Sequence, residues 1–179
     1  MIITLIGMPG AGKSCMGRSL SQKLKMKVID GDRLIESKYD MPLHELIAKV
    51  GLEGFKKIEE EVLLSVEEDN IILSPGGSAV YYDSVMKKCS ERGVVVYLYT
   101  SPATVLERIG DYSKRGIVLE DGKTIEDLFS ERDPLYRKYA DITVNCDGSA
   151  FAKYKHVALC EINKYISREE KALLSAEEA

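Results

Sequence analysis

The sequence predicts an α/β protein with three layers, in which helices flank a central parallel sheet of five strands. Two observations lead to this prediction. Strand-like segments alternate with helix-like segments, an order that favours parallel strands joined by helical crossovers. Residues 71–73 and 94–98 are unbroken apolar runs of strand length, as expected for strands covered on both faces. A length of 179 residues suits one such domain, which we expect to span residues 1–166.

Five short segments rich in apolar residues are the expected strands. They lie at residues 2–6, 27–29, 71–73, 94–98 and 142–144. A helix is expected from about residue 12 to 25, and helical segments follow the second strand to about residue 68. Ser101 and Pro102 offer a cap and a first-turn proline for a later helix, and Thr124 with Asp127 resembles a capping box at the start of another.

Two segments interrupt this rhythm. Residues 110–123 hold three glycines and several charges and are too long for an ordinary connection, so we expect a mobile lid there. Residues 167–179 are rich in Glu, Lys and Ala, and we expect a C-terminal tail or a frayed helix end.

The clearest motif is Gly7–Ser14, which matches the phosphate-loop pattern G-x-x-x-x-G-K-[ST] between an expected strand and an expected helix. Its glycines let backbone N–H groups point inward, and the following helix adds its positive end. We therefore expect a P-loop NTPase fold, with Lys13 reaching the β and γ phosphates and Ser14 contacting Mg²⁺. The expected nucleotide-binding residues here are Gly7, Gly10, Ala11, Gly12, Lys13, Ser14 and Cys15. The alternative, a chance glycine-rich turn, does not explain why all four fixed positions agree.

Two carboxylates, Asp30 and Asp32, follow the second expected strand. Ligands of open α/β sheets bind at the carboxyl ends of the strands. Asp30 is expected to join Ser14 at the Mg²⁺ site, and Asp32 to accept a proton from an attacking hydroxyl. The alternative for Asp32 is a simple cap on a helix that starts at Arg33.

Further candidates lie along the rest of the chain. The small residues at 74–78 allow a close approach of the backbone to a ligand, although a plain turn would also use them. Tyr81 and Tyr82 follow closely and offer hydroxyls to the same pocket. The candidate anion contacts are Arg108, Arg115 and Arg132, each of which would otherwise be a solvated surface residue.

Composition argues against several classes of protein. A net charge of -4 without a basic face disfavours nucleic acid as a partner. No apolar run reaches spanning length and the first strand begins directly after Met1, so we expect a cytoplasmic protein that neither enters a membrane nor carries a targeting segment. We also expect a monomer. The cysteines are too scattered for a zinc or redox pair, and His44 and His156 each lack a nearby second ligand.

In order and spacing, these motifs resemble the shikimate kinase family from the N-terminus to about Cys146. The matching segments are Gly7–Ser14, 30–32, Gly51 with 55–59, 74–78, 95–98, Arg115 and 132–136. The resemblance implies Mg²⁺- and ATP-dependent phosphorylation of a small hydroxylated acceptor, with shikimate first. It also implies that Asp30 supports the metal and that Asp32 contacts the acceptor hydroxyls.

The same resemblance assigns the arginines. Arg115 would contact phosphate and Arg132 the acceptor carboxylate. Arg108 would lie near the adenine, and the segment 145–149, which includes Asp147, would border the base.

The chain departs from the family pattern at three places. The family's F-R reads Phe55-Lys56, its G-G-G ends in Ser78, and its lid R-P reads Arg115-Gly116. A lysine is a point charge and cannot make the forked contact that arginine makes with a carboxylate. The expected acceptor-binding residues are Asp32, Lys56, Gly76, Gly77, Ser78 and Arg132.

Two alternatives stay open beside a shikimate kinase. One is a kinase of the same fold that acts on another polyol or hydroxy acid. The other is a nucleotide-binding regulatory protein without transfer activity. A signalling GTPase is disfavoured because the sequence has neither an N-K-x-D nor a D-x-x-G motif.

Overall fold

The computed structural model describes residues 1–109, 123–148 and 150–177, with side chains as far as residue 172. Its centre is a parallel sheet of five strands in the order β2-β3-β1-β4-β5. The strands are β1 (Ile2–Ile6), β2 (Lys27–Asp30), β3 (Ile71–Ser74), β4 (Gly93–Tyr99) and β5 (Ile142–Asn145). This confirms the predicted α/β fold and each expected strand, to within a residue or two at the ends.

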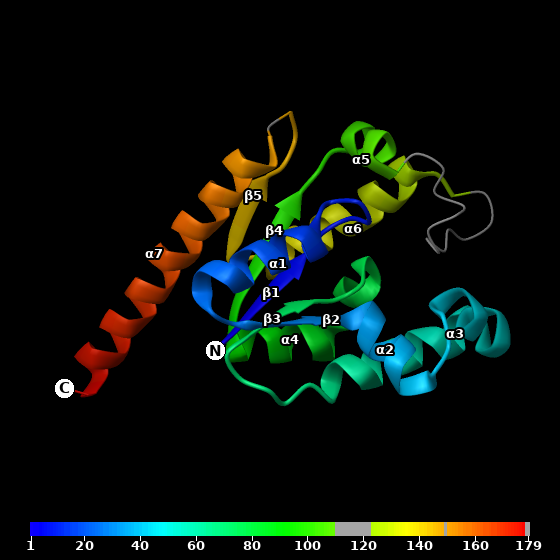
Figure 1. The fold of residues 1–179 in the computed structure, drawn as a ribbon, viewed down its shortest axis with the longest axis horizontal. Helices are drawn as coiled ribbons and strands as arrows, with labels where there is room; N and C mark the ends of the chain where they lie inside the picture. The colour runs from blue at the N-terminus through cyan, green and yellow to red at the C-terminus, as the bar shows by residue number, and fades with distance from the viewer. Residues whose placement is uncertain (110–122, 149, 178–179) are drawn as a thin grey trace.

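Helices cover both faces of the sheet, which makes three layers (Figure 1). They are α1 (Lys13–Leu24), α2 (Gly31–Tyr39), α3 (Leu43–Leu64), α4 (Asp83–Arg92), α5 (Pro102–Ile109), α6 (Ile125–Tyr139) and α7 (Phe151–Glu177). A short 3-10 helix, η1 (Gly77–Tyr81), follows β3. None of the described helices is both long enough and apolar enough to cross a membrane.

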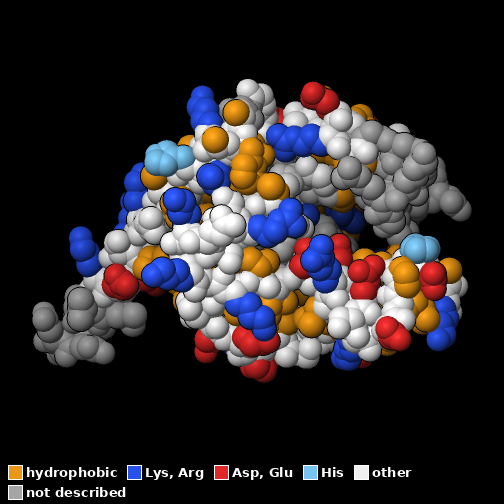
Figure 2. Space-filling view, viewed as in Figure 1, with side chains coloured by type: hydrophobic (Ala, Val, Ile, Leu, Met, Phe, Trp, Pro, Cys, Tyr) orange, Lys and Arg blue, Asp and Glu red, His pale blue; other side chains and the backbone are white. Residues whose placement is uncertain are grey.

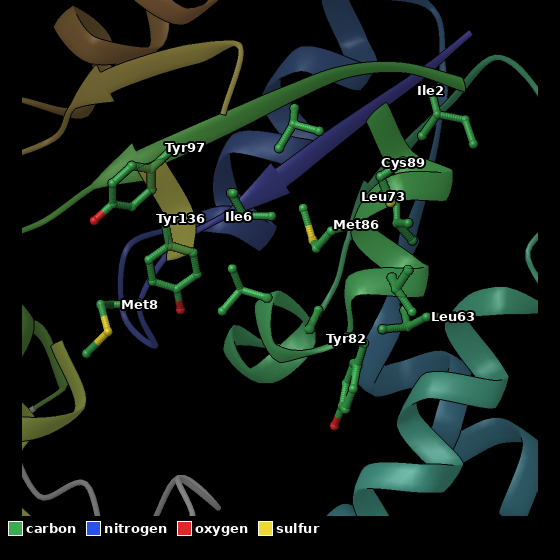
Figure 3. Packing of buried hydrophobic residues seen from close by; sticks show 14 of the residues in the cluster. Ile2, Ile6, Met8, Leu63, Leu73, Tyr82, Met86, Cys89, Tyr97 and Tyr136 are labelled. Carbon is green, nitrogen blue, oxygen red and sulfur yellow. The ribbon is translucent and has the colours of Figure 1, made fainter. Parts of the chain in front are cut away.

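Alternation along the strands divides the core into two parts. In β1, Ile3 and Leu5 face α1 and α7, whereas Ile2 and Ile6 face the opposite layer. That second part of the core brings side chains of η1, α4, α5 and α6 onto the sheet, and Figure 3 shows it from close by. Tyr136 stacks on Tyr97 there, with ring centroids 5.0 Å apart.

The α2–α3 unit extends past the β2 edge of the sheet (Figure 1). The two helices pack through a small apolar cluster that includes Ile35, Leu46, Phe55 and Val62. Gly51 interrupts α3 with a φ of 73°, a left-handed conformation that favours glycine. The helical segments predicted to about residue 68 are two helices, α2 and the kinked α3. Helix α3 ends at Leu64, four residues before the predicted end.

The expected caps are present. Thr124 and Asp127 form a reciprocal capping box at the start of α6. Residues 167–177, expected as a tail or a frayed helix end, continue helix α7. All four cysteines are free. The expected lid lies outside the described residues, except for Lys123.

Candidate active site

A cavity of about 1040 Å³ opens at the carboxyl ends of β1, β2 and β3. The surface is hollowed between the α2–α3 side and the α5–α6 side of the molecule, and charged side chains gather around this hollow (Figure 2). Its lining includes the phosphate-loop residues, both aspartates that follow β2, the turn that follows β3, and Arg132 from α6. The topology therefore brings together segments that lie more than a hundred residues apart.

Glycines shape the loop between β1 and α1. Gly10 has a φ of 77°, and a Cβ built there would lie 2.6 Å from Cγ1 of Ile109. Gly12, the N-cap of α1, has a φ of 94° and provides no side-chain cap for the N–H groups of the first turn. Those N–H groups and the helix dipole form an anion site, as the sequence predicts for a phosphate loop.

Lys13 lies across this loop. Its Nζ donates hydrogen bonds to the carbonyl oxygens of Gly7 and Met8 at 2.9 and 3.2 Å. Burial lowers the pKa of Lys13 to about 8, although the nearby carboxylate of Asp32 opposes this effect. An arriving phosphate would supply the negative charge that this partly buried ammonium requires.

Ser14 and Asp30 meet as the sequence predicts. The Ser14 hydroxyl donates a hydrogen bond to Oδ2 of Asp30 at 2.9 Å, and Oδ1 of Asp30 accepts one from the backbone N–H of Arg33 at 3.3 Å. Asp30 is therefore the N-cap of α2. The capping role that was the alternative for Asp32 is filled by Asp30. Within the described part of the chain, no group of three His, Cys, Asp or Glu side chains could hold a metal alone. One hydroxyl and one carboxylate suit Mg²⁺, which keeps several waters and shares its coordination with substrate phosphates.

Asp32 lies in the first turn of α2 and lines the cavity. Burial raises its pKa to about 6, although Lys13 opposes this effect. A carboxylate with a raised pKa at the carboxyl edge of the sheet has the proton affinity that a general base requires near neutral pH.

The turn after β3 brings opposite charges close to one stretch of backbone. A Cβ at Gly76 would lie 2.5 Å from Oε1 of Glu59 and 3.1 Å from Oδ1 of Asp32. A Cβ at Gly77 would lie 2.9 Å from an Nη of Arg132. These two glycines therefore allow two carboxylates and a guanidinium to approach the same turn.

Glu59 also lines the cavity, and no role is predicted for it from the sequence. It is only 1% exposed, and the Ser78 hydroxyl lies 2.8 and 2.6 Å from its two carboxylate oxygens. The Tyr82 hydroxyl donates to Oε2 of Glu59 at 2.7 Å, and Figure 3 shows this hydroxyl directed away from the apolar core. Burial and the adjacent Glu59 raise the pKa of Tyr82, so its hydroxyl stays protonated. The extra hydroxyl at position 78 is thus bonded to Glu59.

Two further acceptor-side residues occupy different environments. Arg132 is buried at 8% exposure, and its Nε donates to the Tyr81 hydroxyl at 3.1 Å. Lys56 lines the cavity, and its ammonium forms an ion pair of 2.7 Å with Glu53 on the same helix.

The remaining nucleotide-side predictions have mixed outcomes. Arg108 lines the cavity, donates to the carbonyl of Cys146 at 2.6 Å and lies 5.8 Å from the ring centroid of Tyr154. Asp147 instead accepts hydrogen bonds from the backbone N–H of Ser101, and it does not line the cavity found in the described residues. Gly7 and Ala11 support the loop from behind the lining. Arg115 lies outside the described residues.

Comparisons with known proteins agree with this site. The family model "Shikimate kinase" matches residues 9–169. The chain is 40% identical over 151 residues to a shikimate kinase of Francisella tularensis subsp. novicida, which covers 82% of this chain and 86% of the relative. A shikimate kinase of Francisella philomiragia is 39% identical over the same length.

Solved structures show the same likeness. A shikimate kinase from Acinetobacter baumannii in complex with shikimate aligns with a TM-score of 0.81 and 30% identity over 93% of each chain. The enzyme from Aquifex aeolicus aligns with a TM-score of 0.76 and 30% identity over 89% of this chain and 95% of that one. A gluconokinase from Sinorhizobium meliloti, at 14% identity and a TM-score of 0.59, shares the fold. With its phosphate loop, its paired aspartates and these relatives, the chain belongs to the shikimate kinase family.

Proposed function

We propose that this protein transfers the γ phosphate of ATP to a hydroxyl of shikimate. One observation carries the proposal: the carboxylate of Asp32 lies close to Gly76 and the guanidinium of Arg132 close to Gly77, in the wall of one cavity next to the phosphate loop. A carboxylate that receives a proton and a cation that binds an acid are the two groups that a hydroxylated carboxylic acid requires. The structure of the A. baumannii relative is a complex with shikimate, a molecule that carries both hydroxyl groups and a carboxylate.

On the nucleotide side, the backbone N–H groups at the start of α1 bind the β and γ phosphates, and Lys13 moves from the loop carbonyls to the γ phosphate. Ser14 and Asp30 would hold Mg²⁺, which when bound would neutralise charge on the phosphates. Arg108 lies where it can contact the base, and Arg115 is proposed to contact the transferred phosphate.

On the acceptor side, Arg132 binds the carboxylate of shikimate, and Gly76 and Gly77 let Asp32 and Arg132 approach the turn on which the acceptor lies. Asp32 orients the attacking hydroxyl and takes its proton as the oxygen bonds to phosphorus. Lys56 lines the same cavity and offers a second positive charge to the acid.

The test is coupled ADP release against a panel of hydroxylated metabolites, with shikimate, quinate and gluconate included. We expect saturable, Mg²⁺-dependent turnover with shikimate. Turnover of another member of the panel alone would identify a kinase for a different hydroxy acid or polyol. ATP binding without turnover of any member would identify a regulatory protein.

A further inference from the structure

Tyr81, the last residue of η1, contacts Arg132 in two ways. Its hydroxyl accepts the hydrogen bond from Nε of Arg132 at 3.1 Å, and its ring lies 5.1 Å from the guanidinium carbon. The hydroxyl also donates to Oε1 of Glu131 at 2.9 Å, whose other oxygen accepts from Lys123 at 3.0 Å. A tyrosine of the acceptor turn is thus bonded both to the arginine on α6 and to the glutamate that precedes it in sequence.

The direction of these hydrogen bonds is fixed by charge. Hydrogen bonds from Lys123 and Tyr81 lower the pKa of Glu131, so this carboxylate is ionised and accepts. Burial raises the pKa of Tyr81, so its hydroxyl keeps its proton and donates it to Glu131. The lone pairs of the same oxygen then face Nε of Arg132.

This arrangement decides which edge of Arg132 meets a ligand. A guanidinium binds a carboxylate through two N–H groups, and Nε is already bonded to Tyr81. The Tyr136 hydroxyl also hydrogen-bonds this guanidinium. The other terminal N–H groups are left for a ligand, and one terminal nitrogen lies close to Gly77 in the cavity wall. Among the described residues, no carboxylate forms an ion pair with Arg132, although the side chain is buried. A buried cation of this kind requires an anionic partner.

We propose that Tyr81 is a positioning residue that makes the enzyme select acceptors bearing a carboxylate, because it holds the terminal nitrogens of Arg132 toward the acceptor. The inference rests on the proposed function and adds a residue outside its direct contacts. It also separates the two adjacent tyrosines of the pocket, since Tyr82 is bonded to Glu59.

The test compares two acceptors, shikimate and its carboxamide, in which a neutral amide replaces the carboxylate. Values of kcat and KM are measured for the full-length wild type, Tyr81→Phe and the matched control Tyr139→Phe. The control also loses a phenolic hydroxyl, which bonds Asp83 and is remote from the described cavity lining. Tyr81→Leu removes the ring as well and separates its contribution from that of the hydroxyl.

We expect Tyr81→Phe to reduce the preference for shikimate over the carboxamide about tenfold, as for a lost hydrogen bond to a charged group. The change should lie in KM for shikimate, with kcat and KM for ATP within about twofold of wild type. Tyr139→Phe should keep the full preference, and Tyr81→Leu should lose more than Tyr81→Phe.

Two results would overturn the inference alone: unchanged kinetics with both acceptors in Tyr81→Phe and Tyr81→Leu, or an equal loss with both acceptors, which would indicate a merely structural role. Wild-type inactivity on shikimate would overturn the proposed function and the inference with it.

Discussion

Replacing Asp32 with asparagine is expected to stabilise the unliganded protein near neutral pH while it removes most of the phosphate transfer. The side chain is exposed to the cavity close to Glu59, and partial desolvation raises its pKa from the ordinary value of 3.8 to about 6. The folded protein therefore binds the proton of Asp32 more tightly than the unfolded chain does. The unfolding free energy falls as the pH rises between these two values, and the loss is complete above about pH 6.

The size of the effect follows from the same pKa. A tenfold change in proton affinity corresponds to about 1.4 kcal/mol, so the raised pKa alone would cost about 3 kcal/mol at pH 7, and the solvent that reaches the exposed carboxylate reduces this cost by about half. Asparagine has nearly the same shape and no charge. We expect a net stabilisation of about 1–2 kcal/mol at pH 7 and about a third of that at pH 4.5.

The assay is urea unfolding of wild type and Asp32→Asn from pH 4.5 to 7.5, together with steady-state kinetics at pH 7.5. The stability difference should grow with pH, kcat should fall by a factor of about 10² or more, and KM for ATP should hardly change. Parallel stability profiles would refute the raised pKa. A collapse of ATP affinity would instead place Asp32 in the metal site and require the roles of the two aspartates to be exchanged.

Three further changes test other parts of the site. Lys13→Ala should abolish turnover and keep a native melting temperature, because the lysine bonds only two loop carbonyls; undiminished turnover would contradict the phosphate-loop assignment. Lys56→Arg should lower KM for shikimate, by about 1 kcal/mol in binding, and change kcat less. The forked guanidinium of arginine binds a carboxylate better than the point charge of lysine does, so an unchanged KM would mean that position 56 does not contact the carboxylate. Gly76→Ala should lose shikimate turnover while ATP binding, measured by calorimetry, is retained, because the new Cβ would displace the carboxylates of Glu59 and Asp32. Gly17→Ala, whose Cβ meets only side chains at 3.4 Å or more, is the matched control, and equal losses in both variants would argue against this reading.

The nucleotide half of the site could be predicted because its determinants are local. A strand, four fixed positions and a helix start define the phosphate loop over a few residues. The meeting of Ser14 with Asp30 needs only one more rule, that parallel strands end at the same edge of a sheet. The assignment of Asp147 to the nucleotide rests on the family resemblance alone and stays a prediction, and its carboxylate accepts hydrogen bonds from the backbone of Ser101.

The acceptor half depends on how α3, η1 and α6 pack against one another. Glu59 is bonded to Ser78 and Tyr82, at separations of 19 and 23 residues, and Arg132 to Tyr81 at 51. No periodicity encodes such pairs. One signal was present in the sequence: Glu59 lies four residues after Phe55 and three before Val62, so a carboxylate stands on the apolar face of a helix. A charge on a buried helix face requires hydrogen-bonding partners. The hydroxyl of Ser78, where the chain departs from the family's G-G-G pattern, is such a partner.

The two hydrogen bonds that Asp30 accepts fix the distance between the site of the phosphate donor and the site of the acceptor hydroxyl. One carboxylate oxygen is tied to Ser14 in the first turn of α1, and the other to the N–H of Arg33 in the first turn of α2. The two helix starts are thereby clamped together, and with them the groups that hold the phosphate and the hydroxyl. In-line transfer tolerates little error in that spacing. Asparagine at position 30 could still cap α2 but would carry no charge for the metal. The clamp would then survive without its ion, so position 30 offers a way to alter metal affinity while the alignment of the two substrates is preserved.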